Sequence, residues 1–191
     1  MRWKMKTCVF FGHAKENYKE YEVYIEEIII DLIEKKGVTQ FYSGGRGKFD
    51  RVCAEIVKKL KENYPEIRNT LVLSYIPQEK DKFIVPKLYD ETVYLLEKRT
   101  PPKFAIFKTN EAMVDKADFV VVATRRSWGG AQKAHEYAKR RKKEIINIFD
   151  YAKDEDELER EMHEFIERQN REEKKRVWEK LVIKMNQMKE K

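Results

Sequence analysis

The chain has 191 residues, of which 41% are hydrophobic, 12% aromatic and 39% charged, and its formal net charge is +7. This composition is that of a globular protein with a core of its own, and it excludes a disordered or fibrous chain. Apolar runs such as Ile28–Ile30 are far shorter than the ~20 residues that a membrane helix needs, so we expect no membrane partner.

The positive charge is unevenly distributed. Residues 151–191 carry 11 basic and 12 acidic side chains, so the excess belongs to residues 1–150. An anionic small molecule or a nucleic acid would suit such a surface, and charge alone does not separate the two. Cys8 and Cys53 lie in apolar runs, where we expect buried, reduced thiols. The basic start is short and no small-residue cleavage site follows it, so we expect a cytoplasmic protein.

Short apolar runs alternate with segments of helical period through residues 1–150. The runs predict five strands, at residues 6–12, 38–43, 71–76, 118–124 and 144–149. The segments predict helices at residues 18–36, 50–64, 104–116 and 129–142. Residues 77–103 predict an irregular excursion with a short helical stretch near residues 89–98. The alternation predicts an α/β, Rossmann-like, doubly wound fold with a mostly parallel five-stranded sheet and helices on both faces.

Composition changes near residue 151. Beyond it, 23 of 41 residues are charged, and apolar side chains recur at a spacing of three to four. We therefore divide the chain into a domain of residues 1–150 and a charged helical extension of residues 151–191. The apolar stripe of the extension could dock on the domain or pair with another copy, which would make a homo-oligomer.

Three glycine-bearing turns follow apolar runs and lead into helical segments. They contain Gly12, then Gly44, Gly45 and Gly47, then Gly129 and Gly130. The strand-to-helix turns of a parallel sheet all emerge at its carboxyl edge, where ligands bind. Glycine lets the backbone approach a ligand, and a helix start offers free N–H groups. Three such turns on one edge predict a site for a phosphate-bearing small molecule.

The second turn, Ser43–Asp50, carries the sharpest local signal. Its glycines could curl backbone N–H groups around an anion, and Arg46 could add a forked contact to phosphate. Asp50 could cap the following helix, or it could accept ribose hydroxyls or polarise a water molecule. The spacing matches neither the dinucleotide-binding nor the Walker A glycine pattern, so a standard dinucleotide or triphosphate site is not predicted.

Further polar and aromatic residues could reach the same edge. His13 follows Gly12 and could act as an acid or base, or as a positioned hydrogen-bonding residue. Trp128 could stack on a base or pack over the sheet edge. Asn110 could read a base or sugar, or could simply lie on the surface. Arg125 and Arg126 add positive charge to the Trp128 loop.

No metal site is predicted, because His135 and His163 show no ligand spacing with each other or with the cysteines. No cofactor is predicted either. The basic run Lys139–Lys143 resembles a nucleic-acid patch, but it lies in the last turn of a predicted helix. Cations there satisfy terminal carbonyls, and no aromatic side chains interleave with the run.

With these residues in place, the chain resembles the SLOG superfamily, which joins lonely-guy phosphoribohydrolases, DprA proteins and YpsA-like proteins. It is most similar to the YpsA-like branch. The matching segments are Thr7–His13, Phe41–Asp50, Tyr89–Asp90, Ala105–Ile106, Asn110 with Met113–Asp118, and Trp128–Ala131. The resemblance covers residues 6–149 and implies a Rossmann-like fold that binds nucleotides or their derivatives through these turns.

The resemblance does not carry over the hydrolytic residues of the lonely-guy enzymes. Those enzymes use a Pro-Gly-Gly-x-Gly-Thr-x-x-Glu segment, and in Trp128–Glu136 the third glycine and the threonine are missing. His135 falls where the glutamate would be, with Glu136 one residue late. The catalytic residues, if the protein is an enzyme at all, are thus unknown.

Three functions follow from the sequence. The leading hypothesis is a sensor or sequestering module that binds a nucleotide or a nucleotide derivative at the carboxyl edge. The first alternative is an N-glycosidase that uses Asp50 or Glu136. The second is DprA-like binding of single-stranded DNA, which we place behind the small-molecule ligand.

Overall fold

The computed structural model describes residues 5–76, 85–96 and 100–152, together with residues 160, 167, 171, 172 and 175. The unit that ends at Tyr151 contains the sheet and its helices. The predicted helical extension of residues 151–191 falls almost wholly outside the described residues, and residues 77–84 and 97–99 of the predicted excursion also lie outside them. The division of the chain near residue 150 stays a prediction.

In the described residues, six parallel strands form one sheet in the order β4-β3-β2-β1-β5-β6. The strands are β1 (Lys6–Gly12), β2 (Val38–Ser43), β3 (Arg68–Leu73), β4 (Glu91–Tyr94), β5 (Phe119–Ala123) and β6 (Glu144–Asn147). The Rossmann-like α/β class is therefore confirmed. The sheet has one strand more than the sequence predicts, and it is parallel throughout rather than mostly parallel.

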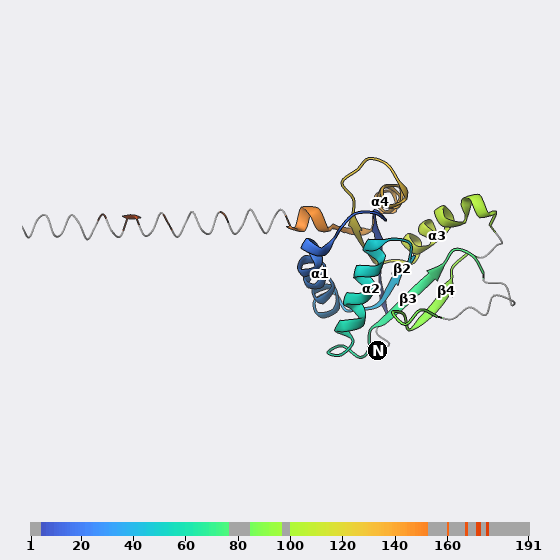
Figure 1. Cartoon of the computed structure of the whole chain (residues 1–191), viewed down its shortest axis with the longest axis horizontal. Helices are drawn as coiled ribbons and strands as arrows, with labels where there is room; N and C mark the ends of the chain where they lie inside the picture. The colour runs from blue at the N-terminus through green and yellow to red at the C-terminus, as the bar shows by residue number, and fades with distance from the viewer. Residues whose placement is uncertain are drawn as a thin grey trace, which may run out of the picture. The chain divides into compact units, whose positions relative to one another are not determined.

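The helices of the unit cover both faces of this sheet (Figure 1). They are η1 (Lys19–Tyr21), a short 3₁₀ helix, then α1 (Glu22–Glu34), α2 (Lys48–Leu60), α3 (Pro102–Lys116) and α4 (Gly130–Arg140). Helices α1 and α2 share one hydrophobic cluster with the sheet, and α3 and α4 share the other. None of the helices described here combines the length and the apolar composition that crossing a bilayer takes.

Strand β1 lies near the centre of the sheet and contributes side chains to both hydrophobic clusters. Cys8 and Phe10 point into the cluster with α1 and α2, whereas Val9 and Phe11 point into the one with α3 and α4. All four side chains are buried, because a strand covered on both faces alternates between two cores rather than between core and solvent.

The predicted helical stretch near residues 89–98 is wrong, because Glu91–Tyr94 forms strand β4 beside β3. Two hydrogen bonds between Asn69 and Asp90 precede this strand pairing. The backbone N–H of Asn69 donates to Asp90 Oδ2 at 2.8 Å, and the N–H of Asp90 donates to the Asn69 carbonyl at 2.8 Å. The Asn69 side-chain amide also donates to the carbonyl of Leu88 at 2.8 Å. These long-range bonds hold the segment extended, and no local period reveals them.

The last strand is shorter than predicted, ending at Asn147 instead of Phe149, and residues 148–151 are helical. The Asn147 side chain takes over the backbone pairing at this point. Its Nδ2 donates to the Thr124 carbonyl at 3.2 Å, and its Oδ1 accepts from the Thr124 N–H at 3.5 Å. Because the Asn147 side chain, and not the backbone, forms these hydrogen bonds beyond the end of β5, strand β6 ends at Asn147.

Candidate functional site

The site lies where the strand order reverses. From β1 the chain moves outward through β2, β3 and β4, and it returns to the other side of β1 at β5. The turns that follow β1 and β5 therefore leave the sheet in opposite directions. Such a switch point opens a crevice at the carboxyl edge of a parallel sheet, which is where ligands bind in this architecture.

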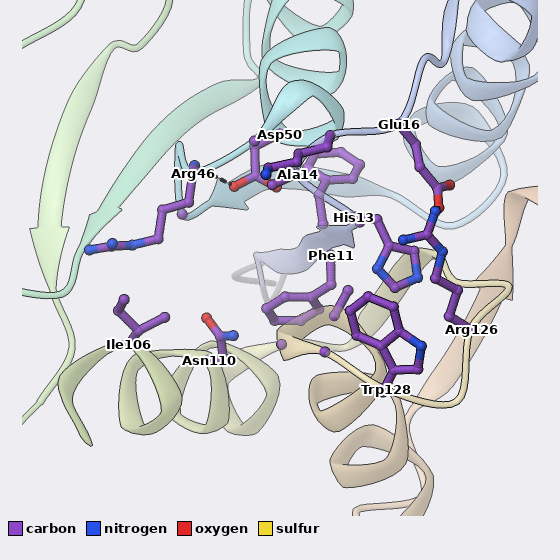
Figure 2. A pocket seen from close by; sticks show the side chains of 18 residues that line it. Phe11, His13, Ala14, Glu16, Arg46, Asp50, Ile106, Asn110, Arg126 and Trp128 are labelled. Carbon is purple, nitrogen blue, oxygen red and sulfur yellow. Dashed lines mark hydrogen bonds and ion pairs between the residues drawn. The ribbon is translucent and has the colours of Figure 1, made fainter. Parts of the chain in front are cut away.

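A pocket of about 430 Å³ occupies this crevice (Figure 2). Its walls come from the turns after β1, β2 and β5 and from α3. Ten of the eleven site residues predicted from sequence line it, namely Gly12, His13, Gly44, Arg46, Gly47, Asp50, Asn110, Trp128, Gly129 and Gly130. Pockets of this size and position suit small molecules. The structure thus brings together glycines that are more than a hundred residues apart.

The remaining predicted residue, Gly45, does not line the pocket. Its φ is +63°, a backbone conformation that side chains rarely adopt. A Cβ on Gly45 would lie 2.6 Å from Leu71 Cδ1, so the residue faces β3. Gly45 therefore shapes the turn and is not part of the pocket wall.

Two other glycines let the first two turns pack against each other. A Cβ on Gly12 would lie 2.3 to 2.5 Å from atoms of the Phe49 side chain, and one on Gly47 would lie 2.6 Å from Ala14 Cα. The N–H of Lys48 also donates to the Ala14 carbonyl at 3.1 Å. Only glycine permits such approaches, so these contacts join both turns into one wall of the pocket.

Both helices that start at the pocket begin with glycine. Gly47 is the N-cap of α2 and Gly129, with φ +104°, is the N-cap of α4. Neither N-cap makes a side-chain hydrogen bond to the helix start. The two starts differ in charge, because the first turn of α2 contains Asp50 and that of α4 contains no acidic residue. The α4 start is the one that leaves its positive dipole end uncompensated.

Asp50 is not the helix cap that we considered from sequence, since α2 begins two residues earlier. Its carboxylate instead reaches back into the glycine turn, where Oδ2 accepts the N–H of Arg46 at 2.9 Å. Burial raises the pKa of Asp50 to about 6, and the backbone hydrogen bond and charge of Arg46 only partly oppose this shift. Asp50 is thus a buried carboxylate in the wall of a pocket.

His13 is buried with an exposed fraction of 9%, and it lines the pocket. The Tyr18 hydroxyl donates to the His13 carbonyl at 3.0 Å and fixes the backbone. The ring nitrogen Nε2 is buried and has no hydrogen-bond partner among the described residues. A Cβ on Gly129 would lie 3.8 Å from the ring, so the imidazole stands beside the start of α4. A buried nitrogen without a partner points to a group that the chain itself does not provide.

An ion pair lies at the same end of the pocket (Figure 2). Arg126 Nη2 is 3.0 Å from Glu16 Oε1, and the guanidinium lies 5.3 Å from the centre of the Trp128 ring. All three residues line the pocket. Trp128 and the charge of Arg126 are expected at this edge from the sequence, whereas Glu16 is not. The position of Glu16 in the same turn as His13 could have indicated that it lies at the pocket.

The other end of the pocket is formed by Arg46 and two residues of α3, Ile106 and Asn110 (Figure 2). The Arg46 guanidinium lies 5.6 Å from the centre of the Tyr75 ring. This end therefore offers an amide, an apolar side chain and a cation. Such a mixture can hold a planar polar ring by its edge and its faces.

Glu136 lies away from the pocket. It accepts a hydrogen bond from Gln132 Nε2 at 2.9 Å and pairs with Lys139 at 3.1 Å. His135 instead contacts the Thr124 hydroxyl, 2.9 Å from its Nδ1. Of the two carboxylates considered for hydrolysis, only Asp50 lines the pocket.

Within residues 5–76, 85–96 and 100–152, no group of three or more His, Cys, Asp or Glu side chains is placed to hold a metal ion. Cys8 and Cys53 are buried free thiols, and burial raises the pKa of both. These thiols therefore stay protonated and unreactive at neutral pH. The pocket wall therefore presents backbone N–H groups, cations and two buried titratable side chains, His13 and Asp50.

Fold and site together define a Rossmann-like α/β protein with a pocket of mixed polar and apolar lining at the switch point of its sheet. The sequence matches no protein-family model and no curated protein. Among solved structures, the fold is similar to that of DNA processing protein A (DprA) from Streptococcus pneumoniae, with a TM-score of 0.55 and 15% identity over 75% of this chain. The present chain spans 50% of the length of that protein.

Two further solved structures share the fold. DprA from Helicobacter pylori, whose single-stranded DNA binding mode has been described, has a TM-score of 0.51 and 14% identity over 74% of this chain and 64% of its own. The molybdenum cofactor binding protein from Rippkaea orientalis has a TM-score of 0.52 and 14% identity over 76% of this chain and 77% of its own. At these identities the likeness establishes the fold alone.

Proposed function

We propose that this protein binds a nucleotide or a nucleotide-derived small molecule in the pocket and acts as a sensor or sequestering module. The observation that carries the proposal is the buried imidazole of His13, which stands beside the glycine start of α4 and whose Nε2 has no partner in the described residues. A ligand anion at this place would accept hydrogen bonds from Nε2–H and from the backbone N–H groups of the first helical turn.

The charges at the two helix starts favour α4 for the anion. Asp50 lies in the first turn of α2, and a second negative group there would meet a buried carboxylate. The first turn of α4 has no acidic residue, and Arg126 lies at the same end of the pocket. Like charges in a partly dry site repel strongly, so we place the phosphate at α4.

The other walls suit the remainder of a nucleotide. The Asp50 carboxylate would accept hydrogen bonds from ribose hydroxyls. The Asn110 amide would pair with the edge of the base, while Ile106 packs on its face and Trp128 covers the phosphate end. We also propose that the chain belongs to the SLOG superfamily, and within it to the YpsA-like branch, whose motifs its sequence resembles. A DprA and a molybdenum cofactor binding protein are among the solved structures with this fold.

A charge placed at the start of α4 tests the proposal. Gly130 lines the pocket, and a Cβ there would have no atom within 4 Å, so both Gly130→Ala and Gly130→Asp should fold. We expect Gly130→Asp to weaken binding of AMP by about tenfold or more, because its carboxylate occupies the anion position. Gly130→Ala, the matched neutral variant, should bind like the wild type.

Calorimetric titration and thermal shift with AMP, ADP-ribose, NAD and adenosine would provide the measurement. Equal affinities of the two variants would place the anion elsewhere, and a wild type that binds none of the four compounds would contradict the proposed function.

A hydrolase is the second candidate, and the position of Asp50 favours it. This buried carboxyl lines the pocket with a pKa raised to about 6, a range suited to acid–base work near neutral pH. If the protein hydrolyses the N-glycosidic bond of a nucleoside monophosphate, Asp50→Asn should abolish the release of free base. Glu136→Gln should not, because Glu136 lies outside the pocket. Chromatographic detection of free base after incubation would decide, and loss of activity in the Glu136 variant alone would contradict this assignment.

Binding of single-stranded DNA finds less support in the basic run Lys139–Lys143. Lys143 Nζ donates to the Ala117 carbonyl at 2.7 Å, and Arg141 pairs with Asp115 at 2.7 Å. These cations therefore satisfy the end of α3. They also lie at the last turn of α4, and its first turn is at the pocket, so the run is at the opposite edge of the sheet. A strand of DNA would have to bridge both edges to use the run and the pocket together.

A further inference from the structure

The ion pair between Glu16 and Arg126 joins the two turns that flank the switch point. Glu16 lies in the turn after β1, and Arg126 lies in the turn after β5. Their side chains are exposed to different degrees, 21% for Glu16 and 48% for Arg126. The carboxylate is thus the more enclosed partner, and the guanidinium keeps a face open to solvent.

The guanidinium of Arg126 has the donor geometry that suits a phosphate. A guanidinium offers five donors in a planar fork, and a single contact to Glu16 leaves several of them free. The centre of the Trp128 ring lies 5.3 Å from the guanidinium, within range of a cation–π contact. In the same pocket wall, the Nε2 of His13 has no partner in the described part of the chain. Arg126, His13 and the start of α4 all line this pocket, and the His13 ring stands beside Gly129.

The negative charge of Glu16 disfavours binding of an anion beside Arg126. Its carboxylate lines the pocket and engages the arginine that an anion would use. A phosphomonoester carries a charge of about −1.5 to −2 at pH 7 and has three terminal oxygens, whereas a phosphodiester carries one charge and two such oxygens. Only the more highly charged group is well suited to replace a carboxylate on a guanidinium.

We propose that Arg126 binds the terminal phosphomonoester of the ligand and that Glu16 competes for this arginine. The pair makes the site selective for nucleoside monophosphates over dinucleotides and unphosphorylated nucleosides. This inference rests on the proposed function and adds to it the class of ligand and the two residues that select it. The glycine turns of the pocket offer backbone N–H groups, which would bind a monoester and a diester alike, so the selectivity lies in this pair.

The variant Glu16→Gln tests the competition. It keeps the size of the side chain and removes its charge, so we expect AMP to bind about fivefold more tightly, the scale of one partly exposed ion pair. The gain should be smaller for NAD and smallest for adenosine, because these carry less charge or none at the terminal position. Glu20→Gln is the matched control, since Glu20 is exposed, four residues further along and not among the pocket-lining residues.

A double-mutant cycle with Arg126→Gln separates this pair from a general change in charge. Arg126→Gln should weaken AMP binding more than adenosine binding, and in its background Glu16→Gln should no longer tighten AMP. Equal gains for the three compounds, an equal gain in Glu20→Gln, or a gain that persists without Arg126 would overturn the inference.

Inorganic phosphate distinguishes failure of this inference from failure of the proposed function. A wild type that binds no nucleotide would defeat the proposed function. The anion position would still be upheld if phosphate raised the Tm of Glu16→Gln more than that of the wild type and left the double variant unmoved. It would be overturned if phosphate affected the three proteins alike or not at all.

Discussion

Gly12→Ala is expected to destabilise the fold by about 3 kcal/mol, the upper range for adding a methyl group to a filled core. The new Cβ would lie 2.3 to 2.5 Å from the Phe49 side chain, well inside van der Waals contact. Phe49 has no free space to withdraw, because it is fully buried between the rings of Phe10 and Tyr18, at centroid distances of 6.5 and 5.0 Å. Urea unfolding followed by circular dichroism would measure the loss.

Two companion variants make this result specific. Gly130→Ala is the same chemical change at a position where the Cβ meets nothing within 4 Å, and it should leave stability unchanged or slightly higher. Phe49→Leu, combined with Gly12→Ala, should recover part of the lost stability, although Phe49→Leu alone is destabilising. A Gly12→Ala protein that unfolds at the same urea concentration as the wild type would show that the close packing of the two turns is wrong.

Asp50→Asn is expected to make the protein more stable at pH 7, by as much as about 3 kcal/mol. The pKa of Asp50 is about 6 in the folded protein and 3.8 in an ordinary environment, so the fold favours the protonated carboxyl. The resulting cost is absent below pH 4, develops as the pH rises from 4 to 6 and is complete above pH 6. Asparagine keeps an oxygen for the Arg46 N–H but carries no charge.

The difference between wild type and Asp50→Asn should therefore shrink as the pH falls from 7 to 4. Urea unfolding at several pH values in this interval measures it. Asp31→Asn, which removes a half-exposed carboxylate paired with Lys35 on α1, is the reference for losing one charge. A stability difference for Asp50→Asn that does not depend on pH would mean that the carboxyl is not buried as described.

The sequence predicted those parts of the fold that depend on local patterns. Apolar runs located five strands, and glycines after three of them located most of the pocket wall, because the carboxyl ends of parallel strands meet at one edge. Strand β4 was missed because long-range bonds between Asn69 and Asp90 hold it extended. Its four residues, Glu91–Tyr94, are too few to show a period.

The site residues were harder to assign than to locate. Asp50 suggested a helix cap, but Gly47 occupies that position and frees the Asp50 carboxylate to bind Arg46 within the turn. Gly45 suggested an anion site, but its missing Cβ faces Leu71. Glu16 was overlooked because its partner, Arg126, is over a hundred residues away. For Gly45 and Glu16 the deciding contact is tertiary, and spacing in the chain does not encode it. For Asp50 it is a hydrogen bond within the turn, whose conformation the glycine spacing does not reveal.

The buried Asp50 has a consequence for the amount of protein in the cell. Its charged carboxylate lowers the stability of the fold at neutral pH, because burial raises its pKa to about 6. A ligand that engages this carboxylate would offset part of the loss, by an amount that grows with the ligand concentration. Copies that lack ligand would unfold more often and be degraded sooner, so the steady-state abundance of the protein would follow the supply of its ligand.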